Sequence, residues 1–169
     1  MALLLSPAVA THQLFDIVVD AFDSQKWEYR TIPDHRVLEV DLETTHSKVV
    51  SYVQVFEEIK AVSAVTNASI TVPNSHLFAT AELLMRTNQE LTVGNLEMLW
   101  DQGLVMFKMT NLFQEADPSV DTVLGMIQTT LAEIDRVTPF LSTLVRTPAD
   151  QVNVPTLMSR EDLLGEDLE

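Results

Sequence analysis

The sequence predicts an α+β protein, with one antiparallel β-sheet and with helices packed on one face of that sheet. Strand-like and helix-like segments occur in separate runs, in the order α-β-β-β-β-α-β-β-α, and such runs favour this class over a regular alternation of strands and helices. Turns of only a few residues join the first four strands, which suits antiparallel neighbours. Each helical segment has a single apolar stripe, so each needs one surface to cover.

The first half of the chain is expected to form one helix and four strands. Residues 11–25 place apolar side chains at helical spacing, and Thr11 can cap the start of this helix. Four strand-like segments, each bounded by turn residues, follow at 27–32, 36–43, 49–56 and 60–68. Alternation is clearest in the second of them, where apolar side chains take turns with mostly acidic ones, as in a strand with one buried face.

The second half is expected to form a helix, a hairpin and a final helix. Residues 76–90 make the first of these helices, and the hairpin follows over 94–113 with its turn at 101–103. Asp117-Pro118 marks the start of the last helix, because an acidic cap followed by proline at the first helical position is typical of helix starts. We expect Pro139 to kink or end this helix, since proline removes a backbone donor.

The chain is expected to divide into a domain over residues 1–147 and a tail over residues 148–169. The first region is long enough to bury a sizeable core. In the second, apolar periodicity is lost, and residues 150–169 contain six acidic side chains against one arginine. This composition predicts a flexible acidic tail.

Composition excludes several classes of site and partner. The 169 residues include no cysteine, which rules out disulfides, thiolate metal sites and cysteine nucleophiles and fits a reducing cytoplasm. A net charge of −15 repels phosphate backbones and anionic lipid surfaces, so we expect no nucleic-acid partner and no membrane partner. No segment has the ~18 uncharged apolar residues of a membrane span. The start, MALLLSPAVA, lacks the basic region and the apolar run of roughly 7–15 residues of a secretory signal, so we expect a cytoplasmic protein.

No catalytic or metal-binding motif stands out. The four histidines are spread over turns and helix starts, without the short spacings of a zinc site. Asp34 and Glu57 lie in turns that solvent reaches, whereas acid–base catalysis requires a pocket that raises the pKa of one carboxyl group. The chain has neither a nucleophile elbow nor a phosphate-binding glycine loop. We therefore expect a non-enzymatic protein without metal or cofactor, and a hydrolase that uses Asp34 or Glu57 ranks last among the hypotheses.

The hairpin is unusual because both of its faces are apolar. Leu96, Met98 and Trp100 form one row of its first strand, which we expect to face the helices. The opposite face then needs a second cover, since a contiguous apolar patch rarely stays bare on a soluble monomer. A second copy of the chain is the expected cover, and a segment of a client protein is the alternative. The residues expected on this protein-binding or dimer face are Leu99, Val105, Phe107 and Met109.

Four segments follow one another in a fixed order between about residue 47 and residue 145, namely SYVQVFEEIKAVSAV, VPNSHLFATAELLMRTN, GNLEMLWDQGLVMFKM and IDRVTPFL. With these segments the chain resembles the YbjN family of bacterial proteins and its relatives with the fold of type III secretion chaperones. Family members are described as candidate sensory-transduction or stress regulators without established chemistry. The similar secretion chaperones are small, acidic, non-enzymatic dimers that bind an extended segment of a client. The resemblance implies no catalytic residues.

These observations predict a non-enzymatic protein-binding module, chaperone-like or regulatory, that acts as a homodimer. The alternative is a small-ligand sensor, in which aromatic side chains line a pocket between the helices and the sheet instead of a packed core. The residues expected in that pocket are Trp27, Tyr29 and Trp100. The sequence names neither the client nor the ligand.

Overall fold

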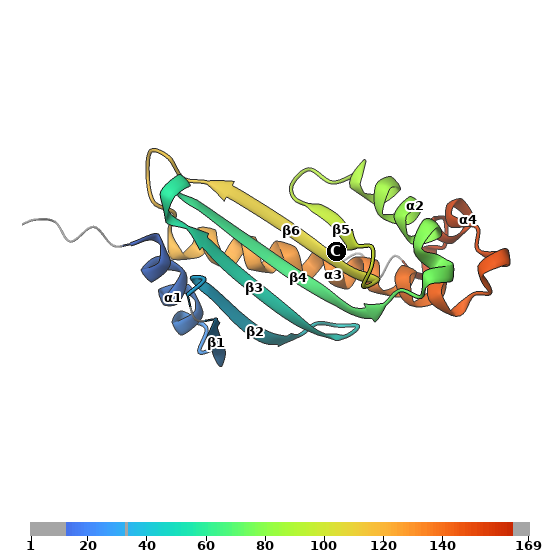
Figure 1. The fold of residues 1–169 in the computed structure, drawn as a ribbon, viewed down its shortest axis with the longest axis horizontal. Coiled ribbons are helices and arrows are strands. Elements are labelled where there is room, and N and C mark those ends of the chain that lie inside the picture. The colour runs from blue at the N-terminus through green and yellow to red at the C-terminus, as the bar shows by residue number, and fades with distance from the viewer. Residues whose placement is uncertain (1–12, 33, 164–169) are drawn as a thin grey trace, which may run out of the picture.

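The computed structural model describes residues 13–32 and 34–163. Within this part of the chain, strands and helices follow one another in the predicted order, with one further short helix after them (Figure 1). The start of the chain, with the Thr11 cap and the expected lack of a secretory signal, lies outside the described residues. The same is true of the end of the acidic tail, residues 164–169.

The sheet has six strands: β1 (Tyr29–Ile32), β2 (Val37–Glu43), β3 (Lys48–Phe56), β4 (Ala61–Thr71), β5 (Asn95–Leu99) and β6 (Leu104–Leu112). Their spatial order is β1-β2-β3-β4-β6-β5, and every neighbouring pair is antiparallel. Because β6 pairs with β4, the hairpin places β5 at one edge of the sheet, and β1 forms the other edge.

The helices are α1 (Leu14–Ser24), α2 (Leu77–Asn88), α3 (Val120–Arg146) and α4 (Val154–Met158). In Figure 1 the long helix α3 passes behind the sheet, α1 lies at one end of the molecule, and α2 and α4 lie at the other end. The helices therefore leave one face of the sheet turned toward the viewer.

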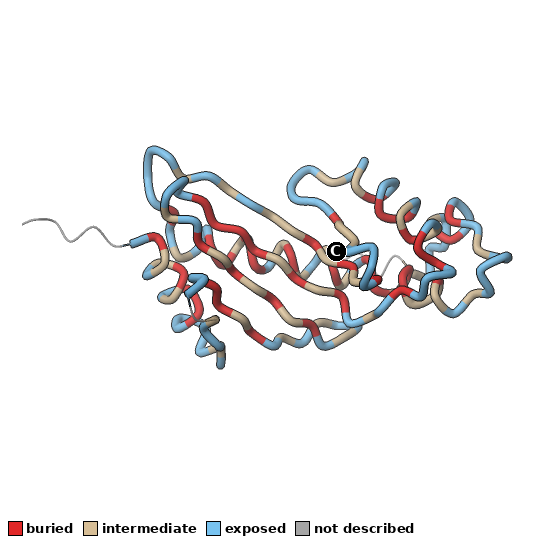
Figure 2. The backbone as a smooth tube through the Cα atoms, in the orientation of Figure 1, coloured by how far each residue is buried: buried red, intermediate tan, exposed pale blue. Residues whose placement is uncertain are grey.

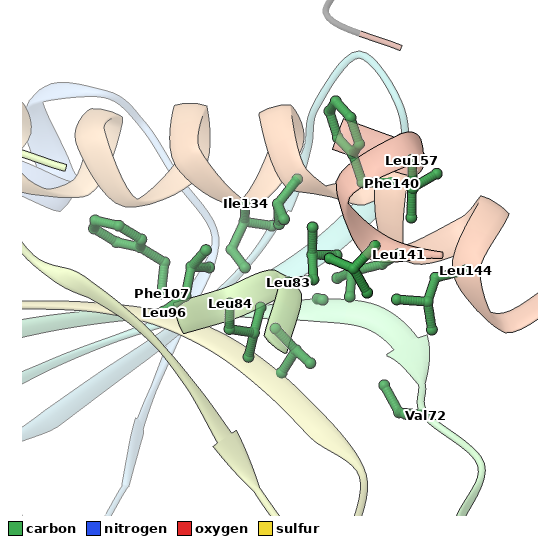
Figure 3. Close-up of a cluster of buried hydrophobic side chains, with 14 of the residues drawn as sticks. Val72, Leu83, Leu84, Leu96, Phe107, Ile134, Phe140, Leu141, Leu144 and Leu157 are labelled. Carbon is green, nitrogen blue, oxygen red and sulfur yellow. The ribbon is translucent and has the colours of Figure 1, made fainter. Parts of the chain in front are cut away.

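The core lies between α3 and the sheet and has two parts. Near α1, the buried side chains include Phe22 and Ile127. Near α2, they include Leu83, Phe107 and Leu141, which Figure 3 shows between the sheet and the helices. Both parts lie on the same side of the sheet, which confirms the predicted α+β architecture with helices on one face.

A chain of buried hydroxyl groups ties α3 to the sheet. The Oγ atom of Ser51 lies 2.7 Å from Oγ1 of Thr66. That atom lies 2.8 Å from Oγ1 of Thr130, which donates to the Ile127 carbonyl at 2.8 Å. Since each of these three hydroxyl groups has a partner, their burial is compensated and favours one register of α3 on β3 and β4.

The last long helix differs from its prediction at Pro139. We expected a kink or an end there, but α3 continues to Arg146 as one helix with Pro139 inside it. The residues that follow, Phe140, Leu141 and Leu144, are all buried. Their packing offsets the free energy lost with the backbone hydrogen bond that proline removes. Tertiary contacts therefore set the length of this helix.

The predicted flexible tail also differs from the structure. Residues 148–163 fold back and contact α2 and α3 through α4. Two apolar residues of this helix, Val154 and Leu157, are buried in the part of the core near α2. They are three residues apart and share one helix face, a signal too short to stand out among prolines and acidic residues. The predicted boundary at residue 147 is therefore wrong, and the folded region extends to Leu163.

Candidate protein-binding surface

Within the described residues, no helix covers the face of the sheet opposite α3, which we call the open face. Strand pairing assigns side chains to it: Phe56 pairs with Ala61, and Ala61 pairs with Leu112, so the three form one row across β3, β4 and β6. The alternate residues of β3, such as Val53 and Val55, are buried on the α3 side. Figure 2 shows this alternation as a regular change of colour along the strands.

The middle of the open face is hollowed into an apolar groove of about 750 Å³. A second hollow of about 300 Å³ continues it toward β2, and both share Val65, Leu99 and Met106. Large apolar side chains here are exposed to an unusual degree, with 39% for Phe56, 59% for Ile59 and 61% for Leu112. We call this surface the open-face groove, and its main apolar residues are Phe56, Ile59, Val65, Leu99, Met106 and Leu112.

Charged side chains on the open face are largely paired with one another at its margins. On β1 and β2, Arg30 bridges both Glu39 and Asp41. On β5 and β6, Nζ of Lys108 lies 3.6 Å from Oε1 of Glu97. Tyr52 lies between these margins, and its pKa is raised by burial and further by the negative charge of Glu39. The groove therefore has an apolar floor with a polar rim, which is the usual anatomy of a protein interface.

The predicted face residues are divided between the two sides of the sheet. Leu99 lies on the open face and is 42% exposed. Val105 and Phe107 are fully buried under the helices, and Met109 packs against the same core. For these three residues the prediction of an exposed or dimer-facing position is wrong.

The error has its origin in the turn of the hairpin. A three-residue turn over 101–103 would pair Trp100 with Leu104, whereas the structure pairs Leu99 with Leu104 across a four-residue turn. A change of one residue in register exchanges the two faces of a strand relative to its partner. Met98 therefore lies opposite Val105 on the buried side, and Glu97 lies opposite Met106 on the open side.

The aromatic residues predicted to line a ligand pocket do not meet. Trp27 and Tyr29 both pack edge-to-face on Phe22 of α1, each with a ring-centroid distance of 5.4 Å. Trp100 lies in the β5–β6 turn and packs on Phe78 of α2 at 5.3 Å. These two groups contact different helices, at opposite ends of the molecule (Figure 1), so they form no common pocket.

A smaller apolar patch lies on α2, beside the hairpin turn. Phe78 is 82% exposed although it packs on Trp100, and Met85 is also largely exposed on the same helix. The inward positions of α2 are taken by Leu83, Leu84 and Thr80.

The free edge of β5 is partly closed by a side chain. Oδ1 of Asn88 accepts the N–H group of Leu96 at 2.8 Å, and Nδ2 of Asn88 donates to the Leu96 carbonyl at 3.0 Å. The amide thus takes the place of a neighbouring strand at Leu96. Because unpaired strand edges promote aggregation, this contact protects the edge next to the groove.

The carboxylates considered for catalysis do not form an acid–base pair. Glu57 accepts the N–H group of Phe15 at 3.0 Å and bridges Arg36 at 2.8 Å, so it joins α1 to the end of the sheet where β2 begins and β3 ends. Asp34 is exposed in the turn between β1 and β2. Across 13–32 and 34–163, no three histidine, aspartate or glutamate side chains gather as a metal site would require.

The sequence analysis missed most of the groove, namely Phe56, Ile59, Met106 and Leu112. One signal was available, because Tyr52, Gln54 and Phe56 are two residues apart and therefore share one face of the strand predicted over 49–56. That signal does not decide whether this row faces the helices or the open face, because both rows of β3 contain apolar residues. No helix in the described part of the chain is long and apolar enough to cross a lipid bilayer.

Comparison with known proteins identifies the family. The model of the YbjN family, described as "Putative bacterial sensory transduction regulator", matches residues 15–142. The chain belongs to the YbjN family. No curated protein matches this YbjN-family chain with significant sequence similarity.

Solved structures share the fold of this YbjN-family chain at low sequence identity. The ExsC–ExsE complex includes a chain with a TM-score of 0.58 and 10% identity, over 78% of this chain and 96% of that one. YbjN from E. coli, "a putative transcription regulator", has a TM-score of 0.52 and 10% identity over 78% and 87%. The HopA1–SchA chaperone–effector complex has a TM-score of 0.49 and 14% identity over 80% and 96%. The predicted resemblance to YbjN and to the secretion chaperone-like fold is thereby confirmed.

Proposed function

We propose that this YbjN-family chain is a non-enzymatic protein-binding module, chaperone-like or regulatory, that acts as a cytoplasmic homodimer through its open face. The observation that supports the proposal is the open-face groove, an apolar hollow of about 750 Å³ on the sheet face that no helix within 13–32 and 34–163 covers. Soluble monomers rarely leave a contiguous apolar surface of this kind exposed. A second protein surface is the natural cover.

The shape of the groove suits a protein partner better than a small molecule. It is shallow and spread over β3, β4, β5 and β6, and exposed side chains such as Ile59 and Leu112 stand at its end. Small-ligand sites instead enclose most of the ligand surface. The aromatic residues expected in a ligand pocket pack on two different helices, Trp27 and Tyr29 on α1 and Trp100 on α2. No observation therefore favours the ligand-sensor alternative.

Charge imposes a condition on a homodimer. Two copies that each have a net charge of −15 repel one another, so apolar contact must supply the attraction. Salt screens exposed charges over about 8 Å at physiological ionic strength. A homodimer of this protein is therefore expected to become tighter as salt is added, whereas a complex with a basic partner would become weaker.

Structures with the same fold give further support for protein binding. ExsC, whose complex with ExsE contains a chain of this fold, was solved together with another protein. The description of YbjN from E. coli as a transcription regulator, qualified there as putative, is in keeping with a regulatory role. The proposal transfers protein binding to the present chain and leaves the client unnamed.

Sedimentation velocity at low micromolar concentration tests the homodimer. The expected species has about twice the 18.9 kDa mass of the chain, and Met106→Glu on the open face should convert it to a monomer. Met85→Glu is the matched control, because Met85 is exposed on α2, away from the groove. A wild-type monomer would refute the homodimer. If Met85→Glu dissociates the dimer and Met106→Glu does not, the interface lies on α2 and not on the open face.

A further inference from the structure

The C-terminal segment 148–163 is attached to the domain by very few side chains. Among these residues only Val154 and Leu157 are buried, while Val152, Met158 and Leu163 are half-buried and pack against the same core. The helix in this segment, α4, has five residues, which is far too short to be stable without tertiary contacts. Its position on the domain therefore depends on two buried anchors and the few half-buried contacts beside them.

These anchors cover an apolar groove between α2 and α3. Leu157 belongs to the same core cluster as Leu83 of α2 and Leu141 of α3, and Figure 3 shows it beside Phe140. Removal of α4 would uncover these side chains while the sheet and the open-face groove stay unchanged. The surface between α2 and α3 is therefore an acceptor for a helix, and the chain's own C-terminal segment fills it.

The acceptor is larger than α4. Next to Met158 an unfilled hollow of about 140 Å³ is lined by Leu83, Val137 and Phe140, with Glu90 and Arg136 among its lining residues. A space of this size in an otherwise close-packed region lowers the packing energy of the present occupant. A helix with larger apolar side chains could fill it.

The attachment changes abruptly at the end of α3. Nε2 of the buried His76 lies 2.8 Å from the carbonyl oxygen of Thr147, which fixes the last turn of α3 to the start of α2. Pro148 follows at once, and from there to residue 153 no side chain is buried. A well-anchored point followed by a loosely held segment is the arrangement of a hinge.

We propose that residues 148–163 are a displaceable strap, and that the groove between α2 and α3 accepts an amphipathic helix from a partner protein. The partner helix presents apolar side chains at positions i, i+3 and i+4, as α4 presents Val154, Leu157 and Met158. The strap competes with that helix, so the protein is self-inhibited at this second site. Local opening of weakly packed segments makes such competition accessible without global unfolding. The proposal is independent of the open-face homodimer.

A fluorescein-labelled peptide of residues 148–163 is the probe, and anisotropy is the measurement. The full-length Leu157→Asp chain, whose own strap docks poorly, is expected to bind the peptide at least about ten-fold more tightly than the wild-type chain. Thr156→Asp is the matched control, because Thr156 is exposed on the same helix, and this chain should behave like the wild type. A peptide with Leu157→Asp should not bind.

Equal binding by the wild-type and Leu157→Asp chains, or no binding by a folded Leu157→Asp chain, would overturn the proposal. Wild-type dimers that Leu157→Asp converts to monomers would also overturn it, because the occupant would then be the strap of a second copy. Loss of the homodimer through Met106→Glu has no bearing on this result.

Hydrogen exchange of the wild-type chain keeps the proposal testable if the variant fails to fold. The amides of Leu157, Ser159 and Arg160 donate to backbone carbonyls within the strap. They are expected to exchange at least about a hundred-fold faster than the amides of Leu141 and Leu144 in α3. Equal protection in both segments would show that the strap opens only on global unfolding, which contradicts the proposal.

Discussion

Truncation of Phe107 tests which face of β6 is buried. Its side chain is fully buried, lies opposite Leu96 in the hairpin and belongs to the core near α2. Phe107→Ala removes most of an aromatic side chain from a close-packed site, which typically costs about 3–5 kcal/mol of unfolding free energy. For a chain of this length each kcal/mol lowers Tm by roughly 2–4 °C, so the expected decrease is roughly 6–20 °C.

Urea unfolding at low protein concentration measures the effect, with the slope m checked for constancy. Met106→Ala is the matched control, because Met106 is the next residue of β6 and lies on the open face. In the monomer it should cost no more than about 1 kcal/mol. If Met106→Ala destabilises the monomer more than Phe107→Ala does, the assignment of the two faces is refuted.

Three further substitutions test local contacts. Asn88→Ala removes both hydrogen bonds to the Leu96 backbone, and we expect a loss of about 1–3 kcal/mol with faster amide exchange at Leu96. Gly103→Ala forces a Cβ against the Val72 carbonyl at a backbone φ of +61°, and should cost about 1–3 kcal/mol. Burial raises the pKa of the Asp135 carboxyl group, but hydrogen bonds from Thr44 and His46 together lower this pKa by more than burial raises it. The net pKa of Asp135 therefore lies below its ordinary value. Its stabilising effect is therefore present above the ordinary carboxyl pKa and lost as pH falls through the folded-state pKa, and Asp135→Asn should flatten the acid side of the stability–pH curve.

Two of these substitutions have a matched control variant, and the third is tested by its pH dependence. Gln89→Ala changes a neighbouring exposed residue beyond α2, and it should leave Leu96 exchange unchanged. Gly125→Ala places its Cβ in open space, so it should be neutral or stabilising where Gly103→Ala is not. Urea midpoints of the wild type and Asp135→Asn, compared between about pH 3 and pH 7, should converge at the acid end. Parallel curves over this range would contradict the role given to Asp135.

Local patterns identified most of the elements. The four strands before α2 were predicted because apolar and polar residues alternate in 36–43 and because short turns separate the segments. The helices were predicted from apolar residues at spacings of three and four, as in α1 and α3. These signals depend on residues near one another in the chain, so they needed no knowledge of the fold.

Long-range choices were decided only by the tertiary structure. Both rows of the hairpin are apolar, so its pattern left open which row meets α3, and a turn one residue longer than expected exchanged Met106 and Phe107 between the faces. Residues far away in the chain likewise kept Pro139 inside α3 and placed Leu157 against Phe140. The sequence by itself determined the elements, their order and the acidity, because each is a local or summed property. The fold decided which apolar face is covered, because burial depends on partners that the chain brings together only when it folds.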